Sequence, residues 1–256
     1  MMPSPFDLTG KVAIITGGNG GIGLGMARGL ARAGASIVIA GRNKDKSKEA
    51  VRDVEALGAE ALAISVNVTD TSSVAAMVEA TLKQFGRIDI LINNAGMSVR
   101  QPAHVISLED WNTVIDTNLT SAFICSKAVY PAMKDAGGGK IINIGSMMSI
   151  FGASFAPAYA ASKGGIVQFT KSIALSWAGD NIQANAILPG WIDTALTLKA
   201  REQVPGLNEN VLTRTPAKRW GNIDDLAGTA VFLASSASDF VTGTSIPVDG
   251  GYSVQS

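Results

Sequence analysis

The sequence has little of the usual chemistry of nucleophilic sites and metal sites, with one cysteine, Cys125, and one histidine, His104, in 256 residues. A single cysteine forms no internal disulfide and supplies no cysteine-based zinc cluster. A Ser-His-Asp or Cys-His mechanism would have to use His104 itself. We expect Cys125 to be a helix core residue rather than a reactive thiol, and His104 to lie on the surface rather than touch substrate.

Charge is also scarce, because only 16% of the residues are charged and the 21 basic residues balance the 21 acidic ones. A chain without net charge lacks the basic stripe on which nucleic-acid binding depends, so we expect no nucleic-acid partner. Sparse surface charge on a chain of this size hints that copies of the chain cover part of that surface.

Long apolar runs are absent too, and none reaches the roughly 18 residues of a membrane span. Residues 1–10 show no basic segment followed by an apolar stretch. We therefore expect no signal peptide, no membrane partner and a cytoplasmic location. A chain of this length buries about 70% of its surface in one core, which predicts a single domain over residues 1–256.

What the sequence does have is a regular alternation of two patterns. Apolar, β-rich runs occur at 12–16, 36–40, 61–68, 88–93, 140–144, 182–188 and 244–248. Helical spacing occurs between them, at 23–33, 46–57, 73–85, 108–134, 158–177 and 223–234. Near-continuous apolar strands joined by helices predict an α/β fold, a doubly wound parallel sheet of the Rossmann type with helices on both faces.

Residues 191–219 fit neither a strand nor a compact helix pattern. They follow the carboxyl end of the sixth predicted strand, the edge at which such sheets bind ligands. We expect a substrate lid there, and the alternative is a plain surface excursion.

A glycine-rich loop leads from the first predicted strand into the first helix, as Thr16-Gly17-Gly18-Asn19-Gly20-Gly21-Ile22-Gly23. Glycines let the backbone approach a pyrophosphate, and the amides and dipole at a helix start attract its charge. The order of strand, glycine turn and helix predicts a dinucleotide site, whereas the glycines alone would fit any tight turn.

The end of the second predicted strand indicates which dinucleotide binds. An acidic residue there would hold the NAD ribose, and a basic residue would bind the NADP 2′-phosphate. The chain has Gly41 where the carboxylate would stand, followed by Arg42 and Asn43. Because a guanidinium makes paired hydrogen bonds to phosphate, Arg42 favours NADP(H), with NAD(H) as the alternative if this arginine is merely solvated.

Tyr159 and Lys163 are four residues apart in the predicted helix at 158–177. One helical turn separates them, which brings an ammonium group near a phenol. Since a cation stabilises a phenolate, Tyr159 would then exchange a proton with an alcohol. Ser146 follows the fifth predicted strand, where its hydroxyl would hold the substrate oxygen.

Taken in order, these motifs resemble those of the short-chain dehydrogenase/reductase family, and the resemblance covers residues 10–252. The matching residues are 16–23, Asn93-Asn94-Ala95-Gly96, Asn118, Ser146, Tyr159, Lys163, Pro189-Gly190 and Val248-Asp249-Gly250-Gly251. The resemblance implies that Asn118, Ser146, Tyr159 and Lys163 are catalytic. In the family the asparagine holds a water that links the lysine to solvent, and the lysine also binds the nicotinamide ribose.

The resemblance also implies a set of cofactor contacts. They are Thr16, Gly17, Asn19, Gly20, Gly21, Ile22, Gly23, Arg42, Asn43, Asn67, Val68, Asn94, Ala95, Gly96, Tyr159, Lys163, Pro189, Gly190, Ile192 and Thr194. Asn67 departs from the family pattern, in which an aspartate holds the adenine amino group. Its carbonyl oxygen still accepts a hydrogen bond, so adenine binding is weakened but not lost.

The activity implied is hydride transfer between NADP(H) and a secondary alcohol or ketone, without a metal. Residues 138–148, 219–221 and 232–239 look most like gluconate 5-dehydrogenases, 2-deoxygluconate dehydrogenases and glucose dehydrogenase-like members, which implies a sugar, sugar acid or polyol substrate. Arg100 would either meet an anionic or polyol substrate or be solvated. The family also implies a homotetramer, with the helices at 108–134 and 158–177 at one interface and the last strand at another.

Three other functions stay open. A β-ketoacyl-carrier-protein reductase would need a basic patch for its acidic carrier, which Lys127, Lys134, Arg214, Lys218 and Arg219 allow. A general carbonyl reductase is the second. The third is a catalytically silent NADP-binding sensor, which would be expected to have lost one of the catalytic residues, whereas all four are present.

Overall fold

Seven parallel strands form one sheet, in the order β3-β2-β1-β4-β5-β6-β7, in the computed structural model, which describes residues 4–255. The strands are β1 (Val12–Thr16), β2 (Ser36–Ala40), β3 (Ala61–Ile64), β4 (Ile90–Asn93), β5 (Gly139–Ile144), β6 (Ile182–Pro189) and β7 (Ser245–Val248). The chain runs outward from β1 to β3 and returns to add β4 on the other side of β1. This reversal separates the loops after β1 and β4, and a crevice forms there in such sheets.

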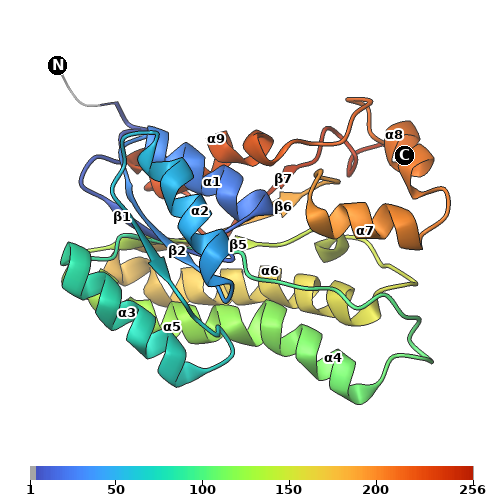
Figure 1. The fold of residues 1–256 in the computed structure, drawn as a ribbon, viewed down its shortest axis with the longest axis horizontal. Coiled ribbons are helices and arrows are strands. Elements are labelled where there is room, and N and C mark those ends of the chain that lie inside the picture. The colour runs from blue at the N-terminus through green and yellow to red at the C-terminus, as the bar shows by residue number, and fades with distance from the viewer. Residues whose placement is uncertain (1–3, 256) are drawn as a thin grey trace.

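Helices cover both faces of the sheet (Figure 1). They are α1 (Gly21–Arg32), α2 (Lys44–Glu55), α3 (Thr71–Phe85), α4 (Leu108–Ile115), α5 (Ser121–Asp135), α6 (Pro157–Trp177), α7 (Ala195–Gln203), α8 (Leu207–Arg214) and α9 (Ala227–Ala234). Packing on one face involves α1, α2 and α9, and on the other α3, α5 and α6. The predicted α/β fold of the Rossmann type is confirmed.

Successive side chains of a strand point to opposite faces of the sheet. Each strand therefore packs against both layers of helices, one on each face. In β1, Ala13 and Ile15 pack with α1, α2 and α9, whereas Val12 and Ile14 pack with α3, α5 and α6. Cys125 is buried in the second layer, and burial raises the pKa of its thiol to about 12. As expected, it is a core residue.

A polar cap or a proline marks the start of three helices around the site, α2, α4 and α6. Asn43 caps α2 by accepting a hydrogen bond from the Lys46 amide, and Ser107 caps α4 in the same way. Proline is the first residue of α6, at Pro157, where a missing N–H costs nothing. These caps fix where the neighbouring loops leave the helices.

The largest differences from the sequence predictions lie in three segments. The third strand ends at Ile64 rather than at residue 68, because Asn67 holds a turn through hydrogen bonds from the Thr69 amide and hydroxyl. The helix predicted at 108–134 is interrupted by a π-helical turn, Asp116–Thr120. Residues 191–219, expected to be without helices, contain α7 and α8.

Residues 1–3 and 256, which belong to the predicted single domain, lie outside the described residues. Within residues 4–255, no helix combines the length and the apolar character that crossing a bilayer requires. The same part of the chain contains no group of three or more His, Cys, Asp or Glu side chains placed to hold a metal ion.

Candidate active site

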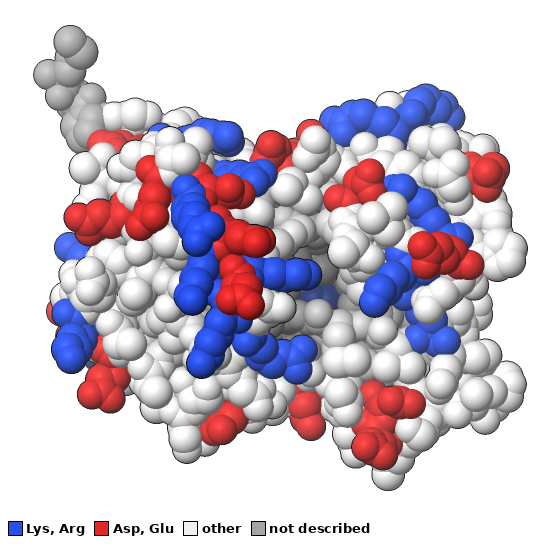
Figure 2. Space-filling view, in the orientation of Figure 1, with Lys and Arg blue, Asp and Glu red and all other residues white. Residues whose placement is uncertain are grey.

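A cavity of about 790 Å³ opens where the parallel strands end, and its wall includes the glycine-rich loop, α6 and most of residues 189–197. Figure 2 shows a hollow near the centre of the molecule, with basic side chains gathered on one rim. Every predicted site residue lines the cavity except Thr16, Gly23 and Asn118. The predicted residues make up about half of the cavity wall.

Thr16 and Gly23 lie behind that wall and shape the glycine-rich loop. The Thr16 hydroxyl donates to the Ile92 carbonyl and accepts from the amides of Asn94 and Ala95, at 3.0 to 3.2 Å, which ties β1 to the loop after β4. At Gly23, a Cβ atom would lie 2.5 Å from the Gly17 carbonyl oxygen. Only glycine fits there without moving backbone.

The first turn of α1 is suited to an anion. Gly20 precedes the helix and offers no side-chain cap, and the first turn contains no acidic residue. Gly20, Gly21 and Ile22 all line the cavity, so N–H groups that a helix leaves without internal partners lie at its wall. Gly21 has a φ of +51°, which a glycine adopts without strain.

At the end of β2, the Asn19 side chain occupies the space next to Gly41 that a side chain there would need. A Cβ atom on Gly41 would lie 2.6 Å from the Asn19 side-chain nitrogen, which itself donates to Ser47 Oγ at 3.1 Å. Arg42 and Lys46 line the cavity and are exposed, and neither forms an ion pair within residues 4–255. Sequence reasoning missed Lys46, although its position one helical turn beyond Arg42 is visible in the sequence.

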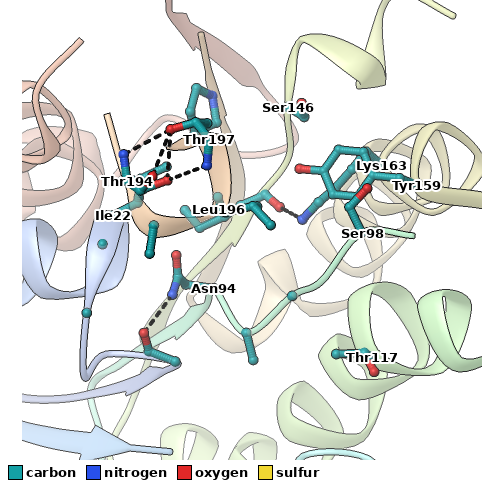
Figure 3. Close-up of a pocket in the computed structure, with 18 of the residues that line it drawn as sticks. Ile22, Asn94, Ser98, Thr117, Ser146, Tyr159, Lys163, Thr194, Leu196 and Thr197 are labelled. Atoms are coloured by element: carbon teal, nitrogen blue, oxygen red, sulfur yellow. Dashed lines mark hydrogen bonds between the residues drawn. The ribbon is translucent and has the colours of Figure 1, made fainter. Parts of the chain in front are cut away.

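Tyr159, Lys163 and Ser146 meet at the inner end of the cavity. Figure 3 shows Tyr159 and Lys163 side by side on α6, with the Tyr159 hydroxyl turned toward Ser146. Lys163 Nζ lies 5.6 Å from the centre of the Tyr159 ring and donates a 2.6 Å hydrogen bond to the carbonyl oxygen of Ile144. Ser146 stands two residues beyond β5 and accepts a hydrogen bond from the Met148 amide.

The electrostatics of these groups follow from their burial. Burial raises the pKa of Tyr159, while the Ser146 hydroxyl and the charge of Arg100 act to lower it. Burial lowers the pKa of Lys163 to about 8. Arg100 is therefore a further cation that acts on Tyr159, besides Lys163, which the sequence pointed to and which lies beside the ring.

Asn118 lies in the π-helical turn and is buried behind the cavity wall. Its side chain accepts from the Met97 amide at 2.8 Å and donates to the Met97 carbonyl at 2.9 Å and to Ser162 Oγ at 3.1 Å. Because Ser162 belongs to α6, Asn118 joins the loop after β4 to the helix that carries Tyr159.

Arg100 and His104 lie in the loop between β4 and α4 and have different surroundings. His104 is exposed and does not line the cavity, in agreement with the expectation. Arg100 lines the cavity and is half-buried, and burial lowers its pKa. Its nearest hydrogen-bond acceptors are the Gln203 side chain and the Leu196 carbonyl.

Comparison with known proteins places this geometry among oxidoreductases. Residues 17–253 match the family model described as enoyl-(acyl carrier protein) reductase. The 2-dehydro-3-deoxy-D-gluconate 5-dehydrogenase of Dickeya dadantii is 45% identical over 253 residues, 98% of this chain and 99% of that protein. The gluconate 5-dehydrogenase of Gluconobacter oxydans is 41% identical over 254 residues, 98% of each chain.

A solved structure has the same architecture. The gluconate 5-dehydrogenase from Burkholderia cenocepacia, crystallised in complex with NADP and tartrate, superposes with a TM-score of 0.93. It is 40% identical in sequence, and the alignment covers 98% of both chains.

Proposed function

The chain belongs to the short-chain dehydrogenase/reductase family of NAD(P)-dependent oxidoreductases, and on that premise we propose that it interconverts the hydroxyl and keto forms of a sugar acid with NADP(H). Curated relatives act on 2-dehydro-3-deoxy-D-gluconate and on gluconate, as their names state. The observation that carries the sugar-acid assignment is the half-buried cation of Arg100 inside the cavity.

The cavity residues fit NADP(H). The uncapped start of α1 suits the pyrophosphate, and Arg42 with Lys46 supplies two cations for a 2′-phosphate. Gly41 leaves no carboxylate in that region to repel the phosphate. When bound, the cofactor carries the hydride. NADP in the Burkholderia structure supports this choice over NAD.

The protein groups handle the proton. In the oxidation direction, the phenolate oxygen of Tyr159 accepts the proton of the substrate hydroxyl while the hydride leaves the same carbon, and a C=O bond forms. In the reduction direction, the Tyr159 hydroxyl returns that proton to the carbonyl oxygen. Ser146 holds the oxygen beside Tyr159, and the ammonium of Lys163 anchors the nicotinamide ribose.

Arg100 gives the site a reason to prefer an acid. Within residues 4–255, no carboxylate lies within ion-pair distance of its guanidinium. A partly buried charge without a counter-charge is costly, and the carboxylate of a sugar acid would supply one through paired hydrogen bonds. A neutral polyol has no such group, so the acid should bind more tightly.

A spectrophotometric panel tests the proposal. NADP or NAD is combined with gluconate, deoxygluconate, glucose or a simple secondary alcohol, and NADPH or NADH with the matching ketones and an acetoacetyl thioester. We expect the highest kcat/KM for a sugar acid with NADP. A preference for the thioester would assign the chain to β-ketoacyl reduction, a preference for NAD would overturn the role of Arg42, and NADPH binding without any turnover would indicate a silent sensor.

We also propose that the chain is a homotetramer whose substrate lid is residues 191–219. Phe123 on α5 and Leu175 on α6 expose apolar side chains on the helices expected at one interface, and Phe240 does so near β7. All residues from 191 to 197 except Asp193 line the cavity, which supports the lid. A monomer in light scattering would contradict the tetramer. The single domain and the cytoplasmic location stay predictions.

A further inference from the structure

Helix α7 holds the guanidinium of Arg100 at two points. Arg100 Nη1 donates a 2.9 Å hydrogen bond to the side-chain oxygen of Gln203, and Nη2 donates a 3.2 Å hydrogen bond to the carbonyl oxygen of Leu196. Leu196 and Gln203 are seven residues apart in α7, which is close to two turns and places them on one face. Arg100 therefore lies along this face and joins the loop after β4 to the residues that follow β6.

Both acceptors are uncharged. An amide oxygen and a carbonyl oxygen orient a guanidinium but do not neutralise it, whereas a carboxylate would do both. Within residues 4–255, neither Glu202, which lies in α7 beside Gln203, nor Asp193, which precedes the helix, forms an ion pair with Arg100, and Asp193 accepts a 3.0 Å hydrogen bond from Arg201 instead. The charge of Arg100 is thus left for whatever enters the cavity.

The hydrogen bonds to α7 also leave donors free. A guanidinium carries five N–H groups, and the two contacts use one on each terminal nitrogen. An incoming carboxylate can therefore bind Arg100 while Gln203 and Leu196 keep their hydrogen bonds. Leu196 itself lines the cavity and lies between Ile22 and Tyr159 in the view of Figure 3.

We propose that Gln203 is a specificity-determining positioning residue, whose amide aims Arg100 at the cavity without cancelling its charge and so selects acidic over neutral substrates. The inference rests on the proposed function, because it assumes that the substrate carboxylate meets Arg100. In this inference Gln203 touches neither the substrate nor the cofactor, and it belongs to none of the family motifs.

The test compares two isosteric exchanges of an amide for a carboxylate. Gln203→Glu places a counter-charge against Arg100, while Asn210→Asp makes the same change of charge on α8, at an exposed residue that does not line the cavity. A third variant, Gln203→Leu, removes the acceptor but leaves the charge of Arg100 in place. The readout is the ratio of kcat/KM for gluconate to kcat/KM for its neutral counterpart sorbitol, both with NADP.

We expect Gln203→Glu to lower this ratio by at least about tenfold, mainly through the KM for gluconate, because an internal carboxylate replaces the one that the substrate supplies. Gln203→Leu should lower it by a smaller factor of roughly three, since the guanidinium keeps its charge but loses one hydrogen bond. Asn210→Asp should leave the ratio within about twofold of the wild-type value.

The outcomes separate this inference from the proposed function. If the wild-type enzyme prefers gluconate and Gln203→Glu keeps the same ratio, the role of Gln203 is overturned while the function stands. An equal loss of kcat/KM on gluconate and sorbitol would reduce Gln203 to structural support for α7 and overturn the specificity role as well. A wild-type enzyme that prefers sorbitol, or that oxidises no sugar acid at all, contradicts the proposed function and the inference together.

Discussion

The ammonium group of Lys163 donates its 2.6 Å hydrogen bond to a neutral acceptor, the carbonyl oxygen of Ile144 at the end of β5. No carboxylate within residues 4–255 forms an ion pair with this lysine, which is 4% exposed. Its pKa of about 8 follows from that burial. The charged form that the site uses is therefore held at a cost to folding.

Replacing Lys163 with Met should stabilise the protein while abolishing turnover. The pKa is lower in the folded state, so below about pH 8 the folded protein holds a proton at a cost, and stability rises with pH from about 8 toward 10.5. Removing the charge should raise the free energy of unfolding at pH 7 by about 1–3 kcal/mol, after allowing for the unpaired Ile144 carbonyl. Urea unfolding at several pH values measures this, and the gain should shrink above pH 8. A loss of stability at pH 7 would argue against a charged, uncompensated lysine.

Replacing Tyr159 with Phe should remove the hydroxyl that donates and accepts the proton and leave the rest of the site in place. We expect kcat to fall by at least about a hundredfold, the usual scale for losing a positioned acid or base, while NADPH affinity is retained. Steady-state kinetics and a fluorescence titration with NADPH measure the two effects. Turnover close to that of the wild-type enzyme would exclude Tyr159 as the catalytic group.

Replacing Arg42 with Ala should affect one cofactor more than the other. We expect the KM for NADP to rise several-fold or more and the KM for NAD to change little, because only NADP carries the 2′-phosphate. Lys46→Ala should shift the two values in the same directions by a smaller factor. Equal changes for NADP and NAD would mean that Arg42 does not read the phosphate.

Two glycines of the phosphate loop should respond differently to the same added methyl group. At Gly23 a Cβ atom would lie 2.5 Å from a backbone oxygen, so Gly23→Ala should cost roughly 1–3 kcal/mol of stability. At Gly20 the backbone is extended and a Cβ atom would have no neighbour within 4 Å. Because Gly20 lines the cavity, Gly20→Ala should keep the thermal stability and raise the KM for NADP. Thermal melting without cofactor distinguishes the two variants. Similar melting temperatures for Gly23→Ala and Gly20→Ala would count against the packing role of Gly23.

Replacing Arg100 with Met should move the pH profile of the reaction. The charge of Arg100 lowers the pKa of Tyr159, so its removal raises that pKa, and the alkaline rise of alcohol oxidation should occur at higher pH. Sorbitol is the suitable substrate, because it carries no carboxylate of its own. The pH dependence of kcat/KM measures the shift, and an unchanged profile would show that Arg100 does not act on the tyrosine.

The features of this protein that could be predicted from its sequence are those that depend on local patterns of residues. Residues 12–16 and 36–40 form β1 and β2 with the predicted bounds, because a buried strand of a parallel sheet is apolar throughout. The residues of the glycine-rich loop and of α6 were found because their spacing follows directly from strand, turn and helix geometry.

The parts that sequence reasoning missed depend on contacts between distant segments. Helix α7 is short and weakly amphipathic, and its one local signal is the pair of Thr194 and Thr197, whose side chains cap its first turn. The contact between Arg100 and Gln203 joins residues 103 positions apart, and no spacing rule predicts it. The effect of the Arg100 charge on Tyr159 likewise joins two segments that are far apart in the sequence.

The π-helical turn around Asn118 also determines how this segment can change in evolution. Such a turn holds one residue more than an α-helical turn, and each residue rotates a helix by about 100°. Deleting one residue between 116 and 120 would restore a continuous α-helix and turn Cys125 and Val129 of α5 away from the core. Substitutions can accumulate along α4 and α5, but their combined length is fixed, and insertions are confined to the loops on either side.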